Sequence, residues 1–103
     1  MMAEKIIDVR PGGDFAWTKT ANLGTTAVRL RFRWLPQLLR WTMRMETPGG
    51  VVLTSQSLCQ AEGSVPFDPY ADGAPGGSLR WEGLDTRQAS DLGTRLRLIW
   101  TEP

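Results

Sequence analysis

The chain has 103 residues, of which 41% are hydrophobic, and its formal net charge is +1. This length supports one domain that buries about two thirds of its unfolded surface, and it is too short for two. The near-neutral charge does not indicate a nucleic-acid-binding protein. Eleven glycines, seven prolines and five tryptophans favour short strands with frequent turns over long helices. We therefore predict a single all-β domain over residues 1–103.

The absence of histidine from the sequence argues against catalysis. It removes the commonest general base, the serine–histidine nucleophile pair and the commonest transition-metal ligand. The clustered acids Asp68 and Asp72 lie in a proline-broken segment that lacks the alternating oxygen ligands of a calcium loop. The single cysteine, Cys59, excludes an internal disulfide and is expected to be buried. We predict that the protein is not an enzyme and holds no cofactor and no metal ion.

The sequence also shows no membrane or export signal. No apolar run approaches the roughly 20 residues that cross a bilayer. The opening residues, MMAEKIIDVRPGG, lack the apolar centre of a secretion signal. We expect a chain that is made in the cytoplasm, stays soluble and does not bind a membrane.

Two short strands are predicted at the start of the chain. The first covers residues 5–10 and ends at Pro11-Gly12-Gly13, because proline lacks an amide donor and glycine accepts turn angles. The second covers residues 15–21, and Asn22-Leu23-Gly24 then turns into the next segment.

Residues 25–47 predict a β-hairpin with one apolar face and one arginine face. Successive side chains of a strand point to opposite sides of the sheet, so an alternating sequence separates the two kinds of residue. The apolar positions are Val28, Leu30, Phe32 and Trp34 in the first run and Leu39, Trp41, Met43 and Met45 in the second. The opposite positions are Arg29, Arg31 and Arg33 in the first run and Arg40, Thr42, Arg44 and Glu46 in the second.

The turn of this hairpin sets its register. Pro36 pre-sets the backbone angle of a central turn position, so we expect Pro36 and Gln37 at the tip. The expected pairs are then Phe32–Trp41, Leu30–Met43, Val28–Met45, Arg33–Arg40 and Arg29–Arg44. Like charges directly opposite each other destabilise a hairpin, which favours an anionic partner. The alternative is that the arginines extend into water while their stems cover the sheet.

The second half of the chain predicts three more strands and one long loop. Residues 51–59 are predicted to form a strand, and the length of the loop that joins it to the hairpin decides which of its side chains face the core. A three-residue loop places one set of alternate residues on the core side, and a two-residue loop turns the same set outward; the set is Val51, Leu53, Ser55, Ser57 and Cys59. We expect the three-residue loop. Strands follow at residues 79–84 and 94–101, joined by an irregular connection over residues 85–93 with room for one helical turn. The result is about seven antiparallel strands in a meander that forms a barrel or a sandwich.

The loop over residues 60–78 has no period that supports a strand or a helix. Loops of this length inside a compact domain are uncommon unless they bind something, and Val65, Phe67 and Tyr70 offer apolar contact points. The alternative is that Phe67 and Tyr70 pin the loop to its own domain. The complete set of predicted partner-binding residues is Arg29, Arg31, Arg33, Leu35, Leu38, Arg40, Arg44, Phe67 and Tyr70.

A single-stranded nucleic-acid-binding barrel is the alternative function, because arginines interleaved with aromatic residues bind phosphates and stack bases. The alternation argues against it. The aromatic residues and the arginines of the hairpin lie on opposite faces of one sheet. Nucleic acid is therefore not the partner that we expect.

The order of landmarks along the chain resembles the small baseplate plug proteins of tailed phages, including the cyanophage type. The resemblance covers most of the chain and rests on Leu23-Gly24, Trp41, Gly77-Ser78-Leu79, Asp91-Leu92-Gly93-Thr94 and the final Leu96, Leu98 and Trp100. It implies a structural virion protein that closes the tail-tube or baseplate-hub channel. It also implies a homo-oligomer, expected as a trimer, with hub, tube or tape-measure subunits as further partners.

Overall fold

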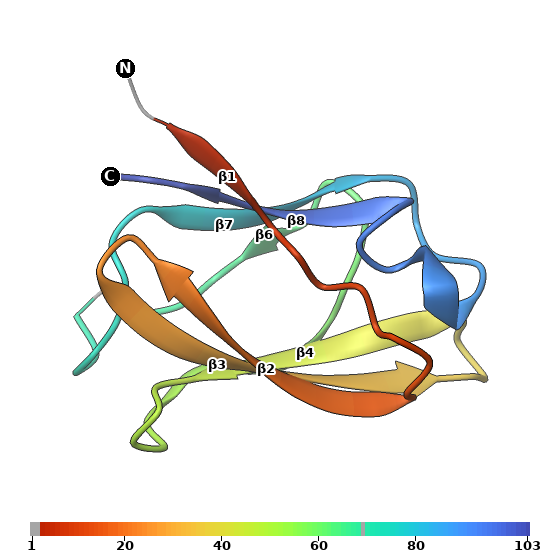
Figure 1. Ribbon diagram of the computed structural model, residues 1–103, viewed down its shortest axis with the longest axis horizontal. Helices are drawn as coiled ribbons and strands as arrows, with labels where there is room; N and C mark the ends of the chain where they lie inside the picture. The colour runs from red at the N-terminus through yellow and green to blue at the C-terminus, as the bar shows by residue number, and fades with distance from the viewer. Residues whose placement is uncertain (1–2, 69) are drawn as a thin grey trace.

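Eight strands form two four-stranded antiparallel sheets that face each other in a computed structural model, which describes residues 3–68 and 70–103 (Figure 1). The first sheet has the order β1-β8-β7-β6 and the second has the order β2-β3-β4-β5. The strands are β1 (Glu4–Ile7), β2 (Ala16–Leu23), β3 (Thr26–Leu35), β4 (Arg40–Glu46), β5 (Val52–Leu58), β6 (Ser64–Val65), β7 (Ser78–Gly83) and β8 (Leu96–Thr101). The all-β prediction is confirmed, and the arrangement is a sandwich.

The second sheet is the predicted meander. Each of its strands pairs with the next one along the chain, because the connections between them are short. The β2–β3 turn contains Gly24 at φ 68°, and a side chain there would approach the Trp100 ring to 3.3 Å. Glycine therefore serves both the turn angle and the contact between the sheets.

The first sheet joins the two ends of the chain. β1 pairs with β8, so that Lys5 lies opposite Trp100 and Ile7 opposite Leu98, and the first and last strands lie side by side (Figure 1). β7 pairs with the other edge of β8. The short β6 pairs with β7 inside the segment for which we predicted no strand, and Pro69 of that segment lies outside the described residues.

One hydrophobic core fills the space between the sheets. The predicted apolar face of the hairpin is confirmed for most of its positions: Phe32 is 3% exposed and Trp41, Met43 and Met45 are fully buried. Leu39, which was predicted on this face, instead lies in the turn and is 49% exposed. The Trp17 ring stacks on Phe32 at 4.4 Å. Other buried members are Val28, Leu30, Cys59, Trp81, Leu96, Leu98 and Trp100. The expectation that Cys59 is buried is therefore confirmed.

The hairpin register differs from the prediction by two residues. Phe32 lies opposite Met43, and Leu35 opposite Arg40, so residues 36–39 form the loop. Leu39 adopts a positive φ of 51° in this loop, a conformation that nothing in its residue type favours. The predicted pairs Arg33–Arg40 and Arg29–Arg44 are wrong. Arg29 lies opposite Glu46, Arg31 opposite Arg44 and Arg33 opposite Thr42. A shift of two residues keeps the side chains that remain within the two strands on their predicted faces, because strands have a period of two.

β5 follows the predicted orientation only in part. Ser57 lies opposite the buried Met43, and Leu53 is 6% exposed, as the three-residue loop requires. Register shifts on both sides of Met45 then change the alternation, so that Thr54 lies opposite Met45. Val51 is consequently outside the strand and 43% exposed.

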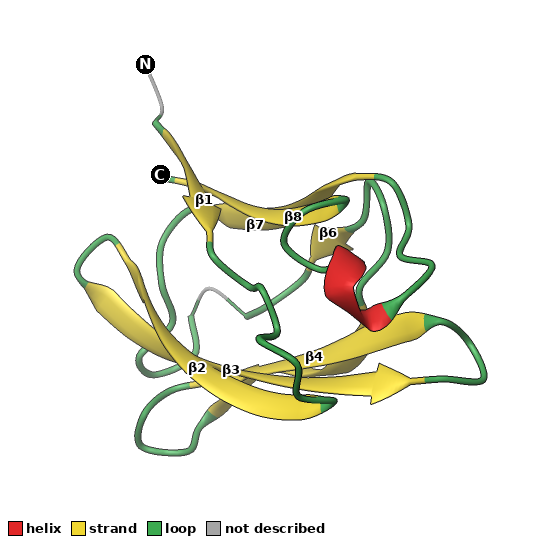
Figure 2. Cartoon of the chain, turned by 45° about the vertical axis from the view of Figure 1, so that its right-hand side comes forward, coloured by secondary structure: helices red, strands yellow, loops and turns green. Residues whose placement is uncertain are grey.

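The predicted helical turn is present as η1 (Ala89–Asp91), a 3₁₀ helix that packs at one end of the sandwich (Figure 2). The Trp41 indole N–H donates to the Ala89 carbonyl at 3.0 Å, which fixes this segment to β4. No helix among the described residues has the length and hydrophobicity to cross a membrane.

Candidate functional site: an arginine face and an apolar end

The outer side of the β2-β3-β4-β5 sheet carries Arg29, Arg31, Arg33 and Arg44, which we call the arginine face. Glu46, also on this side, is the only carboxylate between residues 15 and 61. Its side chain is only 5% exposed, and it accepts Arg29 Nη1 at 3.2 Å and Arg31 Nε at 3.0 Å on Oε1. Arg44 Nε lies 3.5 Å from Oε2. One buried carboxylate thus holds three guanidinium groups together.

Glu46 changes the electrostatic argument about the hairpin. The sequence predicted that an external anion relieves the repulsion between arginines, but the chain supplies its own first counter-ion. Removing the Glu46 carboxylate alone would cost stability, because the arginine charges would stay close together without a counter-ion. The compensation is incomplete, since four guanidinium groups face one carboxylate. The Arg33 guanidinium makes no hydrogen bond or ion pair with any described residue, although the Arg33 carbonyl accepts the Thr42 hydroxyl at 3.3 Å.

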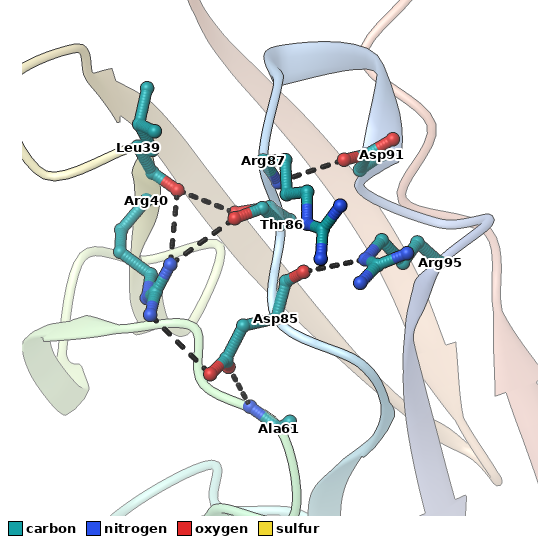
Figure 3. A network of polar contacts seen from close by, with 8 residues as sticks. All are labelled: Leu39, Arg40, Ala61, Asp85, Thr86, Arg87, Asp91 and Arg95. Carbon is teal, nitrogen blue, oxygen red and sulfur yellow. Dashed lines mark hydrogen bonds and ion pairs between the residues drawn. The ribbon is translucent and has the colours of Figure 1, made fainter.

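Arg40 belongs to a different part of the molecule, at the start of β4. Its Nη1 donates to the Thr86 carbonyl at 3.2 Å and its Nη2 lies 3.4 Å from Asp85 Oδ2 (Figure 3). Arg40 therefore holds a loop of its own chain and is not part of the arginine face.

A polar network extends from Arg40 across the loop that precedes η1 (Figure 3). Asp85 Oδ1 accepts the Ala61 amide at 2.7 Å, and the Asp85 carbonyl accepts Arg95 Nε at 2.8 Å. The buried Thr86 hydroxyl donates to the Leu39 carbonyl at 2.8 Å. These bonds fix the β3–β4 turn to the segments before and after η1, which lie far away in the sequence.

Asp91 stabilises the C-terminal part of the same loop, at the end of η1. Its carboxylate accepts the amides of Arg87 at 2.8 Å and Gln88 at 3.1 Å. The Arg87 amide contributes most to lowering the pKa of Asp91, because it stabilises the charged form. The connection over residues 84–95 is thus held by hydrogen bonds at both ends.

Four large apolar side chains are exposed on the loops at this end of the sandwich, and we call them the apolar end. They are Phe15 at 64% exposure, Leu38 at 55%, Leu39 at 49% and Leu84 at 59%. They come from three connections, β1–β2, β3–β4 and β7–η1, that reach the same end (Figure 1). A hollow of about 530 Å³ lies beside Phe15, between residues 10–15 and the η1 segment. Leu35, also predicted as a partner contact, is half-buried.

The structure separates the two aromatic residues of the long loop. Phe67 is half-buried against the core, as in the alternative in which it pins the loop. Tyr70 is 93% exposed. Phe67 lines a groove of about 470 Å³ together with residues 53–57 of β5. This groove includes no residue of the arginine face or of the apolar end.

The described residues show no cluster of side chains suited to binding a metal ion. Across residues 3–68 and 70–103, no three acidic or cysteine side chains gather closely enough to hold a metal ion. Burial raises the pKa of the Cys59 thiol far above its ordinary value, which leaves it protonated and unreactive. The chemistry that these surfaces support is contact with charged and apolar groups.

Sequence reasoning missed two residues of this region, Glu46 and Asp85. A signal for Glu46 was present, because an isolated acid at an outward position among arginines is a natural counter-ion. Asp85 gave no such signal, since its partners Arg40 and Ala61 lie 45 and 24 positions away. No protein-family model, curated protein or solved structure matches the chain, so the resemblance to phage plug proteins stays a prediction.

Proposed function

We propose that the chain is a non-catalytic structural subunit of a phage tail. In this role it closes the channel of the tail tube or baseplate hub, and it contacts hub, tube or tape-measure subunits and further copies of itself. The order of sequence landmarks suggests the family. The two surfaces described above suggest how such a subunit assembles.

The apolar end is the observation that carries this proposal. Exposed large apolar side chains gathered at one place on a small protein mark an interaction surface. The turn that bears Leu38 and Leu39 is held in place, because Asp85 pairs with Arg40 and the Thr86 hydroxyl donates to the Leu39 carbonyl. A surface that is ordered before binding loses less entropy when a partner arrives.

The arginine face supplies a second contact of different character. Its charge exceeds what Glu46 neutralises, so it favours an acidic neighbour and sets the orientation of docking more than its affinity. In a homo-oligomer, the exposed acidic residues Glu62, Asp68 and Asp72 of another copy are one source of that charge.

The single-stranded nucleic-acid alternative has less support. Base stacking needs accessible aromatic faces. Trp41, Trp81 and Trp100 are each at most 6% exposed, and Trp17 stacks on Phe32 inside the sandwich. The arginines therefore have no stacking platform beside them on the same face.

Two matched double variants test the apolar end. Leu38→Ser with Leu84→Ser removes two of its side chains, and Val52→Ser with Leu58→Ser removes two comparably exposed apolar groups from β5. Analytical ultracentrifugation measures self-association and binding to purified tail-tube and hub proteins. We expect the first variant to lose at least about tenfold in affinity, and the second to lose little. Equal behaviour of the two variants contradicts the proposal.

A test of localisation is independent of any variant. Mass spectrometry of purified phage particles detects the chain if it is a virion component, and immunogold electron microscopy places it at the tail tip. Particles that contain the tail proteins but not this chain would falsify the structural role.

A further inference from the structure

A hollow on the arginine face has the chemistry of an anion site. It lies over β3 and β4, has a volume of about 200 Å³, and is lined by Arg31, Phe32, Arg33, Thr42, Arg44 and Gln56. No carboxylate lines it. A water molecule in the liquid occupies about 30 Å³, so the hollow has room for a small oxyanion and a few waters.

The three arginines of this hollow are held near one another by the fold. Arg31 and Arg44 are directly opposite in the β3–β4 ladder, and Arg33 follows on the same face of β3. The two facing arginines both direct Nε to Glu46, through different oxygens. This leaves their terminal Nη groups, which are strong fork-shaped donors, without a partner among the described residues.

The remaining wall adds donors to the site. Gln56 Nε2 donates one hydrogen to Thr42 Oγ1 at 2.8 Å, which fixes the amide and leaves its second N–H for a ligand. The Arg33 guanidinium has no partner in the described part of the chain. The site therefore offers several N–H donors and an excess of positive charge, and Glu46 neutralises only part of that charge.

We propose that this hollow binds a tetrahedral oxyanion, namely inorganic phosphate or the phosphate of a small monoester. A tetrahedral anion presents an oxygen to each of the three guanidinium groups, whereas a carboxylate has only two oxygens to share. Binding also relieves the repulsion between Arg31 and Arg44, which lie directly opposite each other on adjacent strands. This inference does not depend on the apolar end or on assembly into a tail.

Titration of the full chain with sodium phosphate at low ionic strength tests the site, with heat or amide chemical shifts as the readout. Sodium chloride at matched ionic strength is the reference for general screening. We expect one saturable site with half-saturation on the order of 1 mM. Phosphate shifts that equal those of chloride overturn the proposal.

Arg33→Gln is the decisive variant, because Arg33 makes no bond whose loss unfolds the protein. Arg87→Gln is its control: it removes the same charge from an exposed residue outside the hollow. We expect Arg33→Gln to weaken phosphate binding at least about tenfold, as the loss of one charge-assisted contact implies, and Arg87→Gln to leave it within about twofold. Equal affinity in the two variants overturns the assignment.

Two further ligands distinguish the sources of the phosphate group. A small phosphate monoester that binds as well as or better than inorganic phosphate supports an ester ligand, and preference for the free ion supports inorganic phosphate. A short oligothymidylate is the third arm. Binding of the oligonucleotide far more tightly than either small ligand, with a steep salt dependence, overturns the small-anion site in favour of a polynucleotide backbone.

Discussion

Glu46 and Arg29 lie directly opposite each other in the β3–β4 ladder, and the Glu46 carboxylate accepts Arg29 Nη1 at 3.2 Å while its side chain is 5% exposed. The same carboxylate binds Arg31 and Arg44. Glu46 is therefore the shared counter-ion of three arginines in this hairpin. The stability of the protein, its pH dependence and the reactivity of its thiol depend on contacts of individual side chains, and each can be measured.

Glu46→Gln is expected to destabilise the protein by about 2–3 kcal/mol, because three guanidinium groups then face each other without a counter-ion. Urea unfolding measures the change. Glu82→Gln is the matched control: Glu82 also binds two arginines, Arg80 and Arg97, but it is 47% exposed, so we expect a loss of no more than about 1 kcal/mol.

A double variant checks the reason for the effect of Glu46. If repulsion among arginines is the cause, adding Arg44→Gln to Glu46→Gln restores part of the lost stability. A double variant that is less stable than Glu46→Gln alone by the full cost of Arg44→Gln is inconsistent with this explanation.

Leu39→Asn is expected to stabilise the protein by about 0.5–1 kcal/mol. Leu39 has a φ of 51° and is 49% exposed, and asparagine tolerates this conformation better than leucine. Thermal unfolding measures the change, with Leu38→Asn as the control, since Leu38 is similarly exposed and does not have a positive φ. A gain in both variants means that loss of exposed apolar surface, and not relief of backbone strain, is responsible.

Asp91 is expected to make stability depend on pH in the acid range. Its pKa in the folded protein is lowered, chiefly by the Arg87 amide, so its contribution is complete above the ordinary aspartate pKa of about 3.9. That contribution is lost as the pH falls through the lower folded pKa. Asp91→Asn should cost about 1 kcal/mol at pH 7 and progressively less below pH 4, by urea unfolding at each pH.

Asp72→Asn serves as the control for the acid dependence. Asp72 is exposed and makes no hydrogen bond or ion pair with a described residue. Its variant should follow the wild-type pH profile. An Asp91→Asn profile parallel to that of the wild type at every pH shows that Asp91 is not the titrating group.

Cys59 is expected to resist alkylation in the folded protein. It is fully buried, and burial raises the pKa of its thiol, so no thiolate is available to react. Mass spectrometry after iodoacetamide treatment should show modification only at the rate at which the protein opens. A Ser55→Cys variant provides an exposed thiol on β5 in the same chain and should react rapidly at that position alone.

The faces of the strands could be predicted from the sequence, because alternation depends only on the two-residue period of a strand. Val28, Leu30 and Phe32 lie inside for this reason, and Arg29, Arg31 and Arg33 lie outside. The exact pairing of residues across the strands could not be predicted from the sequence. The register depends on a four-residue turn with Leu39 in an unfavourable conformation, and Pro36 suggested a shorter one.

The candidate surfaces were predictable to a similar extent. The arginine face followed from the alternating pattern, and Leu38 was predicted as a contact because of its place in the turn. The role of Arg40 could not be predicted, because its partner Asp85 reaches it only after the two sheets are packed together. β6 was missed because two residues are too few to show a period.

The sequence by itself determined the class of fold, the two faces of the hairpin and the burial of Cys59, since composition and local periodicity control these features. Only the tertiary structure decided which groups meet. β1 joins β8 from the opposite end of the chain, Asp85 fixes the β3–β4 turn, and three arginines converge on Glu46. Such contacts depend on how two sheets pack and twist together, and no local pattern of residues encodes those distances.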